Sequence, residues 1–589
     1  MRKLSRVGCA LLAVIVAPAA TAATCHIKPM AELPVTMSGL QPMIRAEING
    51  KPARFIADTG AWFSLMSSAA AADYGLKLDD APAGLRLSGG GGDIQPRLTT
   101  VNAFTILGVS IPRVEFLVGG SDTGSVGVLG QNFLAMADAE FDLAHGVIRI
   151  IRLEGCNSKS NLVYWAAAGT PYSEVETEDV ARPSHIIAPV YVNGIKLRAM
   201  FDTGASTSFI SRSAASRLGL KAGSPGITDG GQSRGIGRRL VQTWIGPIES
   251  VRIGDEEIRN TRIRFGGDFD GADMLVGADF FLSHRIFWSN KLHRLSFTFN
   301  GGHVFDLANL GTGDDAPGSR PATAAQGAGS EPEPKDADGF TRRGAARAAR
   351  GGLKDALADL DQAAKLAPDN IEILRQRAEL YMRMRQPTKA LDDVDRLLKH
   401  KADDVEAHMM RATLRRQLDQ DAEVRADLDA AASAASKNST WRLQIAGMYS
   451  DIGDYPQAIA QYDLWITAHP EDSLKPSALN GRCWARALSG AALQLALKDC
   501  NAALAAIPHN PSFLDSRGLV RLRMGDFLKA VADYDEALAK DDTMAWSHYG
   551  RGIAELRLGR KDVGEADLAK ARQIDPKLAA KAAKLGITP

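Results

Sequence analysis

Two aspartates of this chain, Asp58 and Asp202, each open the sequence Asp-Thr-Gly-Ala. Two carboxyl groups held about 3 Å apart cannot both be ionised, so they share one proton. The charged carboxylate can take a proton from a bound water, while the protonated carboxyl polarises a carbonyl group. Two facing loops that each carry one aspartate therefore have the chemistry to hydrolyse a peptide bond without a metal ion, a cofactor or a covalent nucleophile.

The residues beside both aspartates suit a pair of facing loops. Thr59 and Thr203 offer hydroxyl groups that can bond across the pair, and Gly60 and Gly204 allow a tight backbone and a close approach. Apolar residues precede each aspartate and can bury the base of its loop. Serines further along are candidates to orient the carboxylates, and the sequence leaves open which of them does so: Ser64, Ser206 or Ser208.

A third Asp-Thr-Gly begins at Asp122 and serves as a control. Typical residue usage predicts roughly 0.1 chance occurrences of this tripeptide in a chain of this length. Asp122 follows the loop-like residues 118–121 (VGGS) rather than an apolar strand, and it runs directly into the apolar residues 127–130. We therefore predict that Asp122 lies in a loop and is not catalytic.

The two Asp-Thr-Gly-Ala sequences lie in two copies of one β-rich segment. The first copy reads AEINGKPARFIADTGAWFSLMS and the second reads VYVNGIKLRAMFDTGASTSFIS. In both, Asn-Gly between apolar stretches predicts a tight hairpin turn. An apolar block closes each copy, with Gly130 lying 72 residues after its aspartate and Gly277 lying 75 residues after its own. The shared order and spacing predict an internal duplication.

Glycine-rich segments lie between the aspartate and the closing block of each copy. They are residues 88–95 (SGGGGDIQ) and 227–237 (ITDGGQSRGIG). Hairpins of this composition can move and can offer backbone donors to a substrate. We predict that they form flaps, whose substrate-binding positions include Gly90, Gly91, Gly230 and Gly231. A plain surface loop is the alternative.

Each β copy resembles a subunit of a retropepsin-like aspartic protease: an apolar strand, Asp-Thr-Gly-Ala, a flap and an apolar block ending in glycine. Such subunits usually dimerise, whereas here two copies lie in one chain, as in the bilobal pepsin-like arrangement. The resemblance covers residues 35–300, about 45% of the chain. It implies an all-β double fold, Asp58 and Asp202 as the catalytic dyad, and an extended peptide as the substrate.

The C-terminal region repeats with a period of 34 residues. The steps between the small residues that open each second helix are 34, 34, 34, 38, 34 and 34. These residues are Ala356, Ala390, Val424, Ala458, Ala496, Ala530 and Gly564. The pattern resembles the tetratricopeptide repeat, which implies an all-α solenoid of about seven copies. Such arrays bind peptides or proteins on a concave face, so we expect a protein partner.

The first residues have the features of a signal peptide. Arg2, Lys3 and Arg6 precede an apolar run at residues 7–20, and Ala-Thr-Ala at residues 20–22 fits a cleavage site. The run is short for a membrane span. We expect residues 1–23 to be removed and the protein to be exported to the periplasm or secreted, without stable membrane insertion. An uncleaved anchor is the alternative.

Composition divides the rest of the chain into four parts. We predict a first half at residues 24–165, a second half at 166–305, a disordered linker at 306–338 and the array at 339–589. The linker predicts that the array and the β region are separable. Lys plus Arg total 70 and Asp plus Glu total 69, a balance that gives no sign of a nucleic acid partner.

Four cysteines remain after residue 23, and an even number in an exported protein allows disulfides. Cys483 and Cys500 lie about equally far from a helix–helix turn near residue 491, so antiparallel helices place them at the same height. We predict that they pair, with two buried free thiols as the alternative. Cys25 and Cys156 bracket the first β copy and form a second candidate pair.

Three interpretations of the function follow. The first is an active endopeptidase whose array recruits a substrate or a partner. The second is a catalytically inactive scaffold for protein interactions in the cell envelope. The third keeps the enzyme but pairs aspartates of different chains. The presence of both Asp-Thr-Gly-Ala sequences favours the enzyme, as a pseudo-dimeric monomer in which Asp58 and Asp202 form one site.

Overall fold

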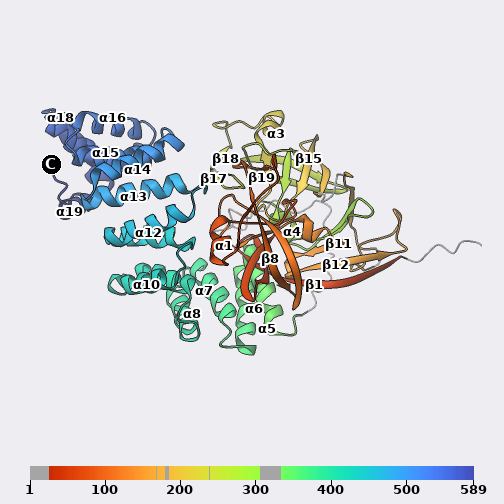
Figure 1. Ribbon diagram of the computed structural model, residues 1–589. Coiled ribbons are helices and arrows are strands. Elements are labelled where there is room, and N and C mark those ends of the chain that lie inside the picture. Colours follow the sequence, from red (N-terminus) through yellow and green to blue (C-terminus); the bar gives the residue numbers. More distant parts are fainter. Residues whose placement is uncertain (1–24, 168, 180–184, 238, 306–332) are drawn as a thin grey trace, which may run out of the picture.

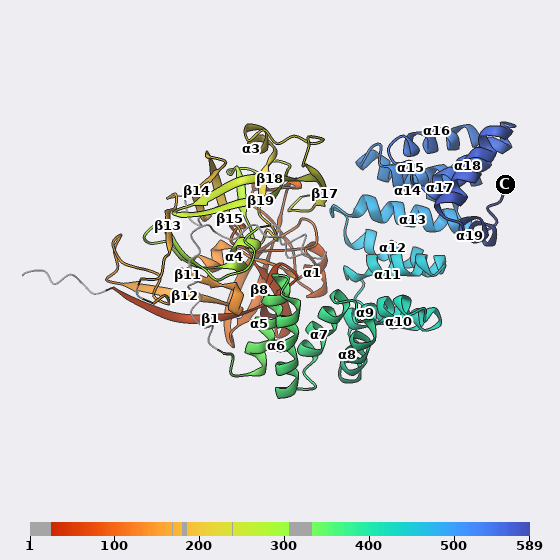
Figure 2. The same cartoon turned by 180° about the vertical axis from the view of Figure 1, so that it is seen from behind.

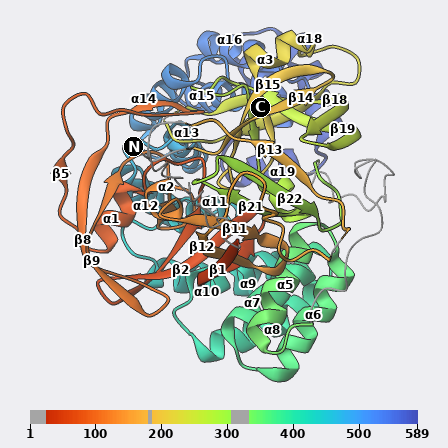
Figure 3. The ribbon, with the colours of Figure 1, turned by 90° about the vertical axis from the view of Figure 1, so that its right-hand side faces the viewer.

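A β-rich region and a helical array lie side by side in the computed structural model (Figure 1). The structure describes residues 25–167, 169–179, 185–237, 239–305 and 333–589. The array rises beside the β region as an arc, and Figure 3 shows the β region in front of it. The predicted signal peptide and residues 306–332 of the predicted linker lie outside the described residues. Within the described residues, no helix is long and apolar enough to cross a membrane.

The first half forms the framework of its Asp-Thr-Gly loop from a hairpin. The turn residues Asn49 and Gly50 both have positive φ, at 50° and 79°, as the predicted tight Asn-Gly turn requires. The strand after the turn also pairs in parallel with the closing block. The elements are β1 (His26–Ser38), β2 (Gln41–Ile48), β3 (Lys51–Ala57), β4 (Leu65–Met66), α1 (Ser68–Asp73), β5 (Asp79–Asp80), β6 (Leu87–Gly89), β7 (Gly92–Ile94), β8 (Arg97–Ile106), β9 (Val109–Val118), β10 (Gly127–Leu129), α2 (Gln131–Leu134), β11 (Asp138–Asp142), a 3-10 turn at Leu143–His145, and β12 (Val147–Glu154).

The second half repeats this framework. Asn193 and Gly194 form the same turn, with φ of 48° and 78°, and the strand that follows again pairs in parallel with its closing block. The predicted duplication is therefore present in the backbone. The elements are β13 (Ser173–Glu176), β14 (Ile187–Val192), β15 (Ile195–Phe201), β16 (Phe209–Ser211), α3 (Arg212–Arg217), β17 (Thr228–Ser233), β18 (Val241–Ile253), β19 (Glu256–Gly266), β20 (Met274–Val276), α4 (Ala278–Ser283), β21 (His284–Ser289) and β22 (Arg294–Phe299).

A sheet shared by both halves joins them. Its strands follow the order β13-β22-β21-β11-β12-β1, and the central pair β11–β21 is antiparallel, with Phe141 opposite Ile286. Buried Glu140 at this junction accepts hydrogen bonds from Arg149 of the first half, at 2.5 Å, and Arg285 of the second, at 2.8 Å. The apolar core is continuous across the sheet. The two halves thus form one body, with their Asp-Thr-Gly loops facing each other.

The array contains seven helix pairs and a final short helix within residues 333–589 (Figure 2). The small residues predicted at the start of each second helix are all buried, where neighbouring helices approach closely. The pairs are α5 (Ala337–Ala349) with α6 (Leu353–Leu366), α7 (Ile371–Arg383) with α8 (Pro387–His400), α9 (Val405–Gln417) with α10 (Asp421–Ala434), α11 (Trp441–Asp451) with α12 (Tyr455–Ala468), α13 (Lys475–Ser489) with α14 (Leu493–Ala506), α15 (Pro511–Arg523) with α16 (Phe527–Leu538), and α17 (Ala545–Arg557) with α18 (Lys561–Ile574); α19 (Leu578–Lys584) follows.

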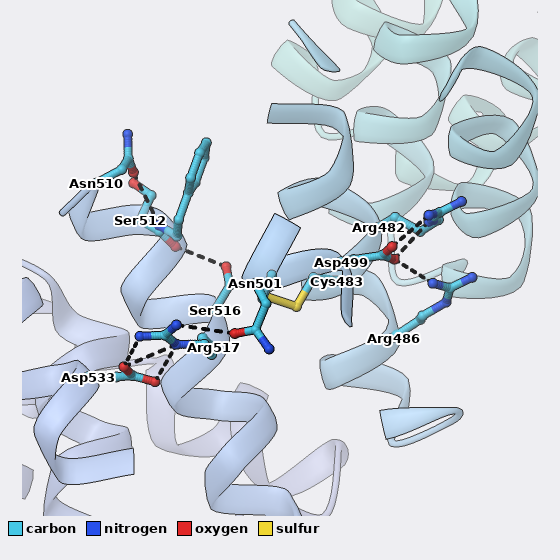
Figure 4. Close-up of a disulfide and its surroundings, with 12 residues drawn as sticks. Arg482, Cys483, Arg486, Asp499, Asn501, Asn510, Ser512, Ser516, Arg517 and Asp533 are labelled. Atoms are coloured by element: carbon cyan, nitrogen blue, oxygen red, sulfur yellow. Dashed lines mark hydrogen bonds and ion pairs between the residues drawn. A yellow bond between two sulfur atoms is a disulfide. The ribbon is translucent and has the colours of Figure 1, made fainter. Parts of the chain in front are cut away.

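A ladder of arginine–aspartate ion pairs runs along the array. In six of the seven repeats, an arginine of the first helix binds an aspartate of the second helix. Five of these arginines also contact an acid or amide of the preceding repeat, and Figure 4 shows Arg482 and Arg517 in such pairs. The pairs are Arg343–Asp359, Arg377–Asp393, Arg411–Asp427, Arg482–Asp499, Arg517–Asp533 and Arg551–Asp567. The fourth repeat has Ile445 and Gln461 at these positions.

Both predicted cysteine pairs form disulfides in the structure. Cys483 on α13 bonds Cys500 on α14, and both side chains are fully buried (Figure 4). Cys25 bonds Cys156, which joins the start of β1 to the segment after β12. Each bridge therefore ties together two neighbouring elements of one region.

The array is not a separate body, in contrast to the prediction from the linker. Ala345, Ala346 and Ala349 of α5 pack into the apolar core of the β region. Ion pairs extend the contact, with Arg45 at 3.6 Å from Glu372 and Arg54 at 3.8 Å from Glu406. The linker composition gave no sign of this contact, because the helix that makes it lies beyond the linker and its apolar face consists of alanines.

Candidate active site

The two Asp-Thr-Gly loops meet across the junction of the halves through their threonines. The Thr59 hydroxyl donates to the Phe201 carbonyl at 2.7 Å, and the Thr203 hydroxyl donates to the Ala57 carbonyl at 2.6 Å. The Thr59 hydroxyl also accepts the Thr203 N–H at 2.9 Å, and the Thr203 hydroxyl accepts the Thr59 N–H at 3.1 Å. Both threonines are fully buried. Four reciprocal hydrogen bonds thus fix the loops face to face, within one chain.

Asp58 and Asp202 follow directly after β3 and β15 and lie between these loops. Oδ1 of Asp58 accepts the N–H groups of Gly60 and Ala61, both at 2.9 Å. Oδ1 of Asp202 accepts those of Gly204 and Ala205, at 2.9 and 3.2 Å. The same loop geometry therefore orients both carboxyl groups.

The two loop glycines allow the carboxyl groups to lie close together. A Cβ atom on Gly60 would lie 2.2 Å from Cγ of Asp202, and one on Gly204 would lie 2.3 Å from Cγ of Asp58. Each carboxyl group thus contacts the opposite loop where only glycine leaves room. The requirement for glycine at both positions, predicted from the sequence, has this steric cause.

The surroundings distinguish the two carboxyl groups. Burial raises the pKa of Asp58 well above its usual range, and the negative charge of Asp202 raises it further. Burial also raises the pKa of Asp202, but hydrogen bonds from Asp58 and the loop N–H groups, and the charge of His185, act in the opposite direction. These contacts favour the shared proton on Asp58 and the negative charge on Asp202.

The predicted flaps meet at their tips. The first is the β6–β7 hairpin, and the second comprises β17, residues 234–237 and 239–240, and the start of β18. The Gly91 N–H donates to the Ile236 carbonyl at 3.0 Å, and the Arg239 N–H donates to the Gly91 carbonyl at 3.1 Å. Gly237 lies against Gly91, where a Cβ atom would be 2.2 Å from the Gly91 carbonyl carbon.

The contact positions of the second flap differ from those predicted. Gly90 and Gly91 lie at the tip of the first flap, but Gly230 and Gly231 lie within β17, and residues 235–237 form the tip instead. Gly231 has a φ of 70° beside a bulge in β17, which explains the glycine there without a contact to the first flap. Because this segment contains several glycines, the sequence did not indicate which of them form the flap tip.

Comparison with known proteins agrees with this geometry. The Aspartyl protease family matches residues 44–133 and 188–280, one match in each half. Two Tetratricopeptide repeat families match residues 348–414 and 516–579. Each β half therefore contains a match to the aspartyl protease family, and the helices form a tetratricopeptide array. A search of curated proteins gave no match.

Solved structures similar to the chain include several tetratricopeptide proteins. A repeat protein from Parabacteroides merdae is 16% identical, with 43% of this chain and 98% of that chain covered and a TM-score of 0.34. PilW, a type IV pilus biogenesis factor, is 18% identical, with coverage of 35% and 94% and a TM-score of 0.30. YrrB is 13% identical, with coverage of 38% and 96% and a TM-score of 0.22.

His185 is a site residue that the sequence analysis missed. The strand registers pair Met43 with Ile56 and Ile187 with Met200, so His185 occupies the position that Gln41 has in the first protease half. Its ring hydrogen-bonds the backbone of Gly60, and Asp202 attracts its charge. Burial lowers the pKa of His185, and these two contacts oppose that effect. Aligning the copies on their aspartates would have indicated this asymmetry.

Two of the three candidate serines, Ser64 and Ser208, bind the closing blocks and not Asp58 or Asp202. The Ser64 hydroxyl donates to Asn132 at 2.9 Å, and the Ser208 hydroxyl donates to Asp279 at 2.7 Å. These two serines also accept the N–H groups of the closing-block glycines, at 3.1 and 2.9 Å. They therefore fix each aspartate loop to its closing block. Burial raises the pKa of Asp279 to about 7, whereas the first half has an uncharged amide there.

Asp122 lies in a loop between β9 and β10, as predicted, and belongs to neither catalytic loop. Its backbone N–H donates to Asp472 of the array at 2.8 Å, and its carboxylate accepts the Gly124 N–H at 2.8 Å. The third Asp-Thr-Gly therefore forms part of the contact between a protease half and the array.

Proposed function

We propose that this protein is an exported aspartic endopeptidase that hydrolyses peptide bonds of protein substrates. The observation that carries the proposal is the pair of Asp-Thr-Gly loops, joined by reciprocal threonine hydrogen bonds with both carboxyl groups between them. The array recruits the substrate or a partner protein, since tetratricopeptide arrays generally bind proteins. Two disulfides and the predicted signal peptide support export to the periplasm or secretion.

The asymmetry of the dyad assigns the chemical roles. Asp202, ionised, takes a proton from a water molecule, whose oxygen attacks the carbonyl carbon of the scissile peptide. Asp58, protonated, donates its proton to the carbonyl oxygen as the tetrahedral intermediate forms. The intermediate then breaks its carbon–nitrogen bond, with one proton passing to the leaving amine and one returning to the dyad. The N–H groups of Gly60 and Gly204 hold the carboxyl groups in place during these steps.

A catalytically inactive scaffold is the competing function. The supporting observation is that the tips of the two flaps are hydrogen-bonded to each other, so the flaps are closed in this structure. The complete dyad favours the enzyme, because a scaffold has no need for two aspartates of raised pKa beside two loop glycines.

The decisive experiment incubates the protein lacking residues 1–23 with a peptide library from pH 3 to 8, with and without pepstatin. We expect cleavage with a bell-shaped pH profile, because one carboxyl must be charged and the other protonated. Asp58→Asn and Asp202→Asn should each abolish cleavage, and the double variant should be no worse, because the pair acts as a unit. Full activity in either single variant would leave the scaffold as the function.

A mixture of the two single variants tests whether the site lies within one chain. A dyad formed within each chain predicts that the mixture stays inactive. Recovered activity would show that aspartates of different chains combine, and the monomeric arrangement would be wrong.

A further inference from the structure

A loop of the array contacts the loop of the first half that binds the tip of the second flap. This loop, residues 469–474 between α12 and α13, faces residues 119–124 of the first protease half. The Asp122 N–H donates to Oδ2 of Asp472 at 2.8 Å, and the Ser473 N–H donates to the Ser121 hydroxyl oxygen at 3.0 Å. Asp472 and Ser473 are both buried. The array and the first half thus share a buried polar contact about 350 residues apart in sequence.

Ser121 extends this contact to the second flap. Its hydroxyl donates to the Gly237 carbonyl at 2.7 Å. The Ser473 N–H occupies the hydroxyl oxygen, so the one hydroxyl proton is free to point at Gly237. A continuous path of two hydrogen bonds therefore runs from the array, through the first half, to the flap tip of the second half.

The flap tip that Ser121 contacts is packed onto the first flap. Ile236, next to Gly237, packs with an apolar cluster that includes Ala61 and Ile56 near the first catalytic loop. The backbone pairs Gly91–Ile236 and Arg239–Gly91 complete the closed arrangement. An extended peptide has to pass beneath these tips to reach the dyad, so the tips must separate before substrate can enter.

The array loop has little freedom to move independently. Oδ1 of Asp472 accepts the Leu474 N–H at 2.7 Å, while Oδ2 binds Asp122. The His469 ring stacks on Trp465, and its Nε2 lies 3.8 Å from the Asp122 carboxylate. The loop is therefore fixed to its own helices, and any displacement of those helices also displaces the contact to Ser121.

We propose that the array acts as a latch that keeps the second flap closed through Ser473, Ser121 and Gly237, and that a protein binding the array opens the site by displacing residues 469–474. The effect on cleavage rests on the proposed function, whereas the effect on the flaps does not. The molecule that opens the latch is a protein that binds the array. Proteolysis would therefore depend on the presence of that partner.

Hydrogen exchange of the flaps tests the latch without any catalysis. Ser121→Ala and Asp472→Ala are each combined with Asp58→Asn, so that no self-cleavage occurs. Each variant should speed exchange in residues 88–92 and 235–240 by roughly threefold to tenfold, the expected effect of losing one hydrogen bond. Asp472 holds the array loop against the loop that carries Ser121, so both changes weaken the same contact. The variant that combines Ser121→Ala, Asp472→Ala and Asp58→Asn should therefore exchange no faster than the stronger of the two.

Thr123→Ala is the matched control, since Thr123 lies in the same loop and its hydroxyl hydrogen-bonds Ser125, outside the path from Ser473 to Gly237. Unchanged flap exchange in both latch variants, or an equal increase in Thr123→Ala, would overturn the proposal. Asp472→Ala lies on the array and leaves the β region intact, so it also answers the case in which Ser121→Ala fails to fold.

In the chain with an intact dyad, both latch variants should raise kcat/KM for a long peptide by a similar factor. A fall in kcat/KM would mean that the contact assists closure on the substrate, and the latch would be wrong. Faster flap exchange with no cleavage by any form, including the unaltered chain, would instead refute the proposed function and leave the latch in place.

Discussion

The reciprocal threonine bonds predict that Thr203→Val will destabilise the β region far more than its small change in shape suggests. Valine has nearly the volume of threonine but removes the hydroxyl that donates to the Ala57 carbonyl at 2.6 Å and accepts the Thr59 N–H at 3.1 Å. Both partners become buried and unpaired, and each such group costs about 1–3 kcal/mol. We therefore expect a loss of about 2–6 kcal/mol in the free energy of unfolding.

Guanidinium denaturation followed by tryptophan fluorescence measures this loss, and Thr203→Ser is the control. Serine keeps the hydroxyl and removes only a methyl group, so its cost should stay below about 1.5 kcal/mol. Thr59→Val should match Thr203→Val, because the two hydroxyls have equivalent contacts. Cleavage should fall on the order of 100-fold in both valine variants, since the loops lose their alignment. Equal stability of the Val and Ser variants would refute the reasoning that the hydroxyl bonds hold the loops together.

Three further predictions follow from the same structure. His185→Gln places the residue of the first half at this position and removes the positive charge that lowers the pKa of Asp202. The pKa of Asp202 should therefore rise, and the acid limb of the pH–activity profile should move to higher pH. An unmoved limb would exclude His185 from the site. Asp279→Asn should stabilise the protein at pH 8 by up to about 4 kcal/mol, because a folded-state pKa of about 7 makes the native carboxyl costly to ionise as pH rises from about 4 to 7. That gain should vanish near pH 4 in denaturant titrations, and a gain independent of pH would contradict it. Protease cleavage within residues 306–332 should leave two fragments that co-elute in gel filtration, because α5 packs into the β core; separate elution would show that this contact is weak.

The sequence alone predicted the parts of the site that local motifs determine. Asp-Thr-Gly-Ala specifies its own loop, and the need for a threonine hydroxyl and a glycine follows from two such loops facing each other. The Asn-Gly hairpins and the 34-residue helical period were equally local. Each of these features depends on residues that lie close together in the sequence. The loop and the hairpin motifs also occur twice, which made them easier to recognise.

The parts that the sequence did not predict depend on partners far along the chain. Strands β11 and β21 pair across the junction although their residues lie about 145 positions apart. The sequence of neither strand indicates which strand it pairs with. The alanines of α5 are as compatible with a helix–helix contact as with a β core. His185 became recognisable only through strand register, and the tip of the second flap depended on which glycines form the turn.

The interrupted ladder gives the array a mechanical property. In repeats one to three and five to seven a guanidinium–carboxylate pair joins the two helices. In the fourth repeat Ile445 replaces the arginine, and Tyr449 instead donates its hydroxyl to Asp429 of the third repeat at 2.6 Å. Ion pairs Arg416–Asp451 at 2.6 Å and Arg425–Asp454 at 2.8 Å still join the third repeat to the fourth. The interruption therefore removes an ion pair within the fourth repeat, whose own stability contributes to that of the solenoid. The first three repeats are anchored to the β core by α5, so a force on the last three repeats should deform the fourth repeat, α11 with α12, first. These two helices directly precede residues 469–474. A deformation of the fourth repeat would therefore first displace the loop that contacts Ser121.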